Sequence, residues 1–131
     1  MTWEMRDKEF EAVLNTPGPK RYLYTVKKVA DFEEVWSLWS DNAWVLAADD
    51  AQHELVPIWP HPRFAAACAT GVWSQSEPRM IELSTWLEKW IPGIGRDSRL
   101  IAVFPTASDK GVVVSSDRLK SDLEDEVSQY E

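Results

Sequence analysis

The chain has 131 residues, of which 44% are hydrophobic and 27% charged, so we expect one folded domain over residues 1–131 rather than a disordered chain. A formal net charge of −8 opposes contact with phosphate backbones and anionic lipids, so neither nucleic acid nor a membrane is an expected partner. A single cysteine, the absence of an 18-residue apolar run and a charged N-terminus without a signal-peptide core together predict a cytoplasmic protein.

Two amphipathic helices are predicted before residue 31. Thr2 suits the N-cap of a helix over residues 3–14, and the turn at residues 17–19 ends it. A second helix over residues 20–30 has an apolar face and an outer basic side, which we interpret as solvated. The basic residues of that side are Lys20, Arg21, Lys27 and Lys28.

Residues 31–39 fit two descriptions. Asp31 and Glu34 have the spacing of a capping box, and the apolar residues that follow fit one face of a helix. Residues 35–59 also suit three strands separated by turn-prone residues at 41–42 and 49–52. We favour the strands, because β-branched and aromatic residues persist through Trp59.

The segment 57–68, PIWPHPRFAAAC, is interpreted as the junction between a strand and a helix. Trp59 closes the strand, and Pro60 cannot continue a central ladder. Pro62 suits the first turn of a helix that runs to Thr70, where the following glycine ends it. The prolines are therefore predicted to shape the chain.

The C-terminal half alternates short strands and helices. A polar loop leads to a strand at 80–83, and Ser84 caps a helix that Pro92-Gly93 is expected to break. Residues 99–105 and 111–115 predict a hairpin before a last helix from residue 116 or 117. The expected fold is α+β, with a mainly antiparallel sheet of about five strands and helices packed on it, two N-terminal and one C-terminal.

The order of several motifs resembles a known family. The motifs are RYLY with Val26, VW-x-L at 35–38, PIWPH at 57–61 followed by Phe64-Ala65, I-x-L at 81–83, Trp90-Ile91-Pro92, and VFP at 103–105 with GVVV beyond. Over about residues 21–123 they resemble a small bacterial family of domains of unknown function (DUF2750-like), and PIWPH followed by Phe-Ala is the most specific element. The resemblance implies a compact soluble domain and brings no activity, cofactor or catalytic residue.

No catalytic or metal-binding group is predicted. Cys68 follows His61 by seven residues, about 10 Å along a helix, which is too far for direct proton transfer. We expect His61 to bond a backbone group at the helix start and Cys68 to pack in the core. The acidic and histidine residues at 49–54 are expected to form a solvated turn, so no metal or cofactor is expected.

Eight tryptophans are the unusual feature of the composition. Trp59, Trp73 and Trp90 flank predicted loops and are candidates for a ligand platform, although we favour core packing and indole anchoring as their role. We expect a non-enzymatic interaction module of regulatory or immunity type that binds a basic partner protein through its acidic surface or beside PIWPH; a homodimer is also compatible. The alternative is a small-ligand binder or enzyme that uses His61 and Arg63, with the arginine holding a carboxylate or phosphate.

Overall fold

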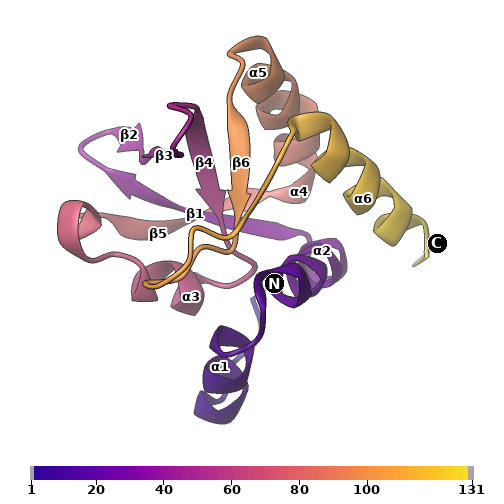
Figure 1. Cartoon of the computed structure of the whole chain (residues 1–131). Helices are drawn as coiled ribbons and strands as arrows, with labels where there is room; N and C mark the ends of the chain where they lie inside the picture. The colour runs from indigo at the N-terminus through magenta and orange to yellow at the C-terminus, as the bar shows by residue number, and fades with distance from the viewer. Residues whose placement is uncertain (1, 130–131) are drawn as a thin grey trace.

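The computed structural model describes residues 2–129 and combines helices with two small sheets (Figure 1). The helical segments are α1 (Asp7–Leu14), α2 (Gly18–Phe32), α3 (Pro62–Ala67), the 3-10 turn η1 (Gly71–Trp73), α4 (Leu83–Thr85), the π-helical turn η2 (Trp86–Trp90), α5 (Ile91–Arg96) and α6 (Ser116–Ser128). The strands are β1 (Glu34–Ser40), β2 (Ala43–Trp44), β3 (Ala47–Ala48), β4 (Glu54–Ile58), β5 (Glu77–Glu82), β6 (Leu100–Val103) and β7 (Val112–Val114).

The strands form two sheets that meet at PIWPH. One sheet has the order β2-β1-β5 and is antiparallel throughout. The other has the order β3-β4-β6-β7, and its central pair β4 and β6 is parallel, with Ile58 opposite Val103. Reciprocal backbone hydrogen bonds of 2.8 and 2.9 Å between Trp36 and Trp59 join β1 to the end of β4.

The α+β class is confirmed, but the single five-stranded sheet is not. A parallel pair requires a long crossover, and residues 59–99 provide it through α3, β5 and the helical run α4-η2-α5. Central strands buried on both faces are continuously apolar, which hides their partners from the sequence pattern. The predicted hairpin of β6 and β7 is confirmed.

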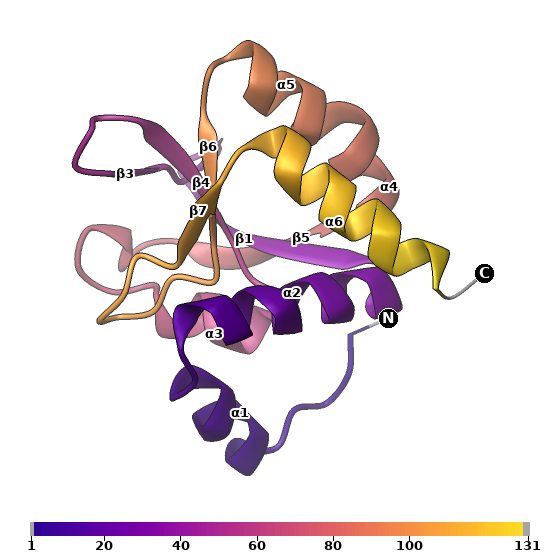
Figure 2. The same ribbon diagram turned by 45° about the vertical axis from the view of Figure 1, so that its right-hand side comes forward.

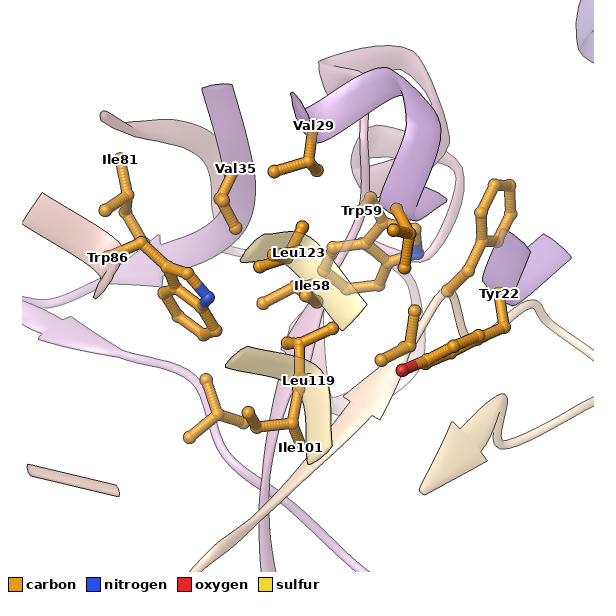
Figure 3. Packing of buried hydrophobic residues seen from close by; sticks show 14 of the residues in the cluster. Tyr22, Val29, Val35, Ile58, Trp59, Ile81, Trp86, Ile101, Leu119 and Leu123 are labelled. Carbon is orange, nitrogen blue, oxygen red and sulfur yellow. The ribbon is translucent and has the colours of Figure 1, made fainter. Parts of the chain in front are cut away.

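The core lies between the four-stranded sheet and the helices α2 and α6. Figure 3 shows Leu119 and Leu123 of α6 close to Ile58 and Ile101 of the central strands. All four side chains are fully buried, and each contributes about 1.5–3 kcal/mol by leaving water. Trp86, also fully buried, fills the same cluster from η2. The core thus fixes α6 against the sheet and beside α2 (Figure 2).

The first two helices differ from the prediction at their ends. Residues 3–6 are not helical, and α1 begins at Asp7. Thr2 caps no helix; its hydroxyl donates to the Glu34 carboxylate at 2.6 Å. The chain re-enters a helix at Gly18, with Pro19 in the first turn, where a missing N–H has no cost. Arg21, expected on the solvated side, is only 3% exposed.

Residues 31–59 contain strands, as favoured, although four short strands replace the three expected. The turns at 41–42 and near 49–52 are confirmed. The prediction that Pro92-Gly93 breaks the helix is wrong. The helical run continues to Arg96. Proline has no backbone N–H to donate, and the π-helical turn just before Pro92 changes the hydrogen-bond pattern so that the helix continues past it.

Candidate functional site

The PIWPH junction is held by hydrogen bonds from its two ring systems. Trp59 is fully buried, and its indole N–H donates to the Pro105 carbonyl at 2.9 Å. His61 caps α3, since its Nδ1 accepts the Arg63 backbone N–H at 3.1 Å, as expected for the helix start. Its Nε2 therefore carries the proton and donates to the Trp3 carbonyl at 2.8 Å. Both imidazole nitrogens thus have partners within the chain.

Arg63 is held by the N-terminal segment. Its guanidinium donates to the Met5 carbonyl at 3.3 Å and to the Asp7 carboxylate at 2.6 Å. The same group lies over the Phe10 ring, 4.2 Å from the centroid. The position that a ligand carboxylate was expected to take beside Arg63 is therefore occupied by Asp7.

Aromatic contacts complete the attachment of the N-terminal segment. Trp3 lies against both Phe32 and His61, with centroids 4.6 Å apart in each case. Phe10 stacks on Phe64 at 5.3 Å. The surface beside PIWPH, which the sequence offered as a docking groove, is thus covered by the chain's own residues 3–10.

Cys68 and Trp59 converge on one backbone oxygen. The Cys68 thiol donates to the Pro105 carbonyl at 3.2 Å, the oxygen that also accepts from Trp59. Burial raises the pKa of the Cys68 thiol, despite the opposing effects of Trp59 and Arg21. A buried thiol kept protonated is a poor nucleophile, so Cys68 is suited to packing.

Arg21 organises the loop between β6 and β7 from inside the protein. Its Nε donates to the Phe104 carbonyl at 3.4 Å, and its Nη2 lies 3.3 Å from Asp109 Oδ2, an ion pair without hydrogen-bond geometry. The hydrogen bond from the Gly111 N–H is the larger cause that lowers the pKa of Asp109, and the nearby Arg21 guanidinium is the smaller one. Gly111 has φ +81°, and an added Cβ would lie 2.5 Å from the Val103 carbonyl, so only glycine fits here.

The remaining two candidates lie in separate places. Trp73 is half-buried beside the loop 105–110, where it borders hollows of about 370 and 210 Å³. Trp90 packs against Trp86 and Trp44 and lines a pocket of about 340 Å³. The structure therefore does not assemble Trp59, Trp73 and Trp90 into one platform. Among residues 2–129, no cluster of three or more histidine, cysteine or acidic side chains is arranged to hold a metal ion.

A groove of about 480 Å³ runs between α2 and α6. We call it the α2–α6 groove. Its apolar floor comes from Pro19, Leu23, Val26 and Val112, and its acidic wall from Asp122, Asp125 and Glu126. Leu23 is 60% exposed, so it presents apolar surface to solvent at this floor. The groove thus sets exposed apolar surface beside negative charge.

One end of the acidic wall is engaged within the chain, and the other is free. The Tyr22 hydroxyl donates to Asp122, whose other neighbour, Arg118 Nε, lies 3.7 Å away. Burial and the Asp122 carboxylate raise the pKa of Tyr22, so its hydroxyl stays protonated. Within the described chain, the carboxylates of Asp125 and Glu126 have no ion-pair partner. They are the charges available to a ligand of the groove.

Sequence reasoning did not find this groove. The sequence predicts the last helix, but its acidic residues do not by themselves mark a site. Leu23 was the available signal, because it falls off the apolar face set by Tyr22, Val26 and Val29. That signal becomes a site only when α6, about a hundred residues later, packs beside α2.

In the part of the chain that the structure describes, no helix has both the length and the apolar composition needed to span a bilayer. A comparison with protein families matches residues 22–123 to a family described as "Protein of unknown function (DUF2750)". Comparisons with curated proteins and with solved structures find no match.

The family match begins in α2 and ends in α6, so it contains Leu23 and Val26 of the groove floor and Asp122 of the acidic wall, while Asp125 and Glu126 follow its end. It confirms the resemblance drawn from PIWPH and the neighbouring motifs. Since the match spans well over half of the chain, the protein belongs to the DUF2750 family of proteins of unknown function.

Proposed function

We propose that the protein is a non-enzymatic interaction module that binds a basic segment of a partner protein in the α2–α6 groove. The observation that carries the proposal is the exposed Leu23 on the groove floor, set beside the carboxylates of Asp125 and Glu126, which have no ion-pair partner among residues 2–129. The engagement of both His61 nitrogens and the raised pKa of the Cys68 thiol disfavour catalysis at PIWPH, which supports a binding role for the protein. The single buried thiol suits work in the cytoplasm.

The chemistry of the groove defines the partner segment. An apolar side chain would cover Leu23 and Val112, and lysine or arginine residues one helical turn away would face Asp125 and Glu126. A net charge of −8 would speed the approach of a basic protein. A second copy of this chain is a poor occupant, because it carries the same negative charge.

The apolar contact should dominate the affinity. Burying a leucine side chain contributes about 1.5–3 kcal/mol, whereas an exposed ion pair contributes about 0.2–1 kcal/mol. We therefore expect the floor to set the strength of binding and the wall to set its preference for positive charge. Substitution of Leu23 should cost more than substitution of either carboxylate.

A defined probe tests the proposal. Isothermal titration calorimetry would measure binding of a 15-residue amphipathic peptide of leucine and lysine to the wild type and to Leu23→Gln, which retains a good helix former. The matched control is Val72→Gln, because Val72 is 97% exposed and lies outside the groove. We expect Leu23→Gln to weaken binding about tenfold, as for a loss of about 1.4 kcal/mol, and the control to leave it unchanged. Equal affinities for all three proteins would rule the groove out.

A further inference from the structure

A second cavity, about 340 Å³ in volume, lies between β2, β4 and the helical run η2-α5. We call it the Trp44–Trp90 pocket. Its apolar lining includes Trp44, Leu46, Trp90 and Ile94, and its charged lining consists of Lys89, Asp97 and Arg99. It shares no residue with the α2–α6 groove, so what it binds is independent of the proposed function.

We propose that the Trp44–Trp90 pocket binds a small aromatic carboxylate. Its volume falls within the range of pockets that hold small molecules, which are mostly apolar with a few polar groups. A π-helical turn, a feature found frequently at functional sites, supplies Lys89 and Trp90.

The indole rings at the pocket favour a ligand with an aromatic part. Trp44 meets Trp90 edge to face, with centroids 4.8 Å apart and an interplanar angle of 83°. Trp39 meets Trp44 in the same manner at 5.0 Å and 80°. Leu46 adds apolar surface that is 37% exposed. A planar ring would cover this surface and add one more contact to an existing aromatic array.

The two cations that line the Trp44–Trp90 pocket, Lys89 and Arg99, indicate the charge of the ligand. Arg99 is already compensated, since its Nε lies 3.2 Å from Glu54 and its Nη1 3.0 Å from Asp97. Lys89 forms no ion pair with any residue in the range 2–129. The carboxylates of Glu54 and Asp97 stay paired with Arg99, so Lys89 is the lining cation that can pair with one carboxylate of a ligand. A carboxylate beside an aromatic ring satisfies both features.

The test uses 2-naphthoate as the probe and its neutral analogue 2-naphthamide as the control ligand. Two-dimensional NMR of the indole N–H groups of the ¹⁵N-labelled full chain reports each tryptophan separately. We expect 2-naphthoate to shift the signals of Trp44 and Trp90 with a dissociation constant below about 1 mM, and to leave that of the buried Trp59 unchanged. The amide should bind about fivefold more weakly.

Two matched variants assign the charge. Lys89→Gln should weaken 2-naphthoate binding about fivefold, to the level of the amide, whereas Lys27→Gln, on the exposed side of α2, should leave it unchanged. Both lysines are exposed, so neither variant should unfold the protein. Equal binding of acid and amide, equal effects of the two variants, or shifts confined to other tryptophans would each overturn the proposal. None of these outcomes depends on the peptide experiment at the α2–α6 groove.

Discussion

Substitution of His61 separates an architectural role of the PIWPH junction from a chemical one. His61→Ala removes the N-cap of α3, which is worth about 1 kcal/mol, and the hydrogen bond to the Trp3 carbonyl, which is worth about another 1 kcal/mol. The partly buried carbonyl left without its donor adds to this loss. We therefore expect a decrease of about 2–3 kcal/mol in the free energy of unfolding.

His61→Asn divides this loss between its two sources. The asparagine oxygen can replace Nδ1 as the acceptor of the Arg63 N–H, but the shorter side chain does not reach the Trp3 carbonyl. The expected decrease is about 1–1.5 kcal/mol. Urea unfolding followed by far-ultraviolet circular dichroism measures both variants against the wild type.

The other histidine provides the control. His53 lies in the exposed turn before β4 and pairs with Asp49, and His53→Ala should change stability by less than about 0.5 kcal/mol. If His61→Ala were as mild as His53→Ala, the architectural role of the PIWPH histidine would be refuted.

Three further predictions concern the core and its titrating groups. Gly111→Ala should cost about 2 kcal/mol or more in urea unfolding, because its Cβ would meet the Val103 carbonyl at 2.5 Å; a neutral result would contradict the geometry. Cys68, whose pKa is raised by burial, should resist a disulfide reagent in the native protein and react fully in denaturant, so rapid native labelling would contradict its burial. Burial first, and acidic partners second, raise the pKa of Tyr22 and Tyr24 in the folded state. Their contribution to the free energy of unfolding is complete below the unfolded-state pKa near 10 and is lost as pH rises above that value, by at most about 1.4 kcal/mol per pH unit for each tyrosine. Tyr24→Phe should reduce this dependence of unfolding free energy on pH between pH 10 and 11. An unchanged dependence would exclude a raised pKa for Tyr24.

Local patterns predicted those elements that are specified by their own residue types. The strands after Glu34 followed from the aromatic and β-branched residues, and the β6–β7 hairpin from its turn. The helix start at Pro62 followed from the chemistry of proline and a capping side chain. Their β-branched, aromatic, proline and capping residues mark these elements locally, although β1 pairs with the distant strand β5, from Glu34↔Glu82 to Trp39↔Glu77.

Errors arose where distant contacts decide the local structure. The helix expected from residue 3 is replaced by an extended segment, because Trp3 packs against Phe32 and His61. Arg21 is buried because its carbonyl and carboxylate partners come from the loop after β6. No local pattern encodes these contacts. The parallel pairing of β4 and β6 was missed for the same reason.

In the candidate site, too, features set by local contacts could be predicted and features set by distant contacts could not. The chemistry of His61 at the helix start could be predicted, because its backbone partner is two residues away. The α2–α6 groove could not be predicted, because Leu23 and Glu126 line one groove only through the packing of two helices that are distant in sequence. An apolar residue on the polar side of a helix is the only sequence signal it leaves.

Charge reversal of the α6 wall tests most directly whether this surface selects a basic partner. The double variant Asp125→Lys with Glu126→Lys should fold, since both positions lie at the surface near the C-terminus of α6, where positive charge is favourable. Calorimetry would compare the leucine-lysine peptide with its leucine-glutamate counterpart on both proteins. We expect the wild type to prefer the lysine peptide and the double variant to prefer the glutamate peptide, each about tenfold. The same preference in both proteins would contradict the assignment of the α2–α6 groove.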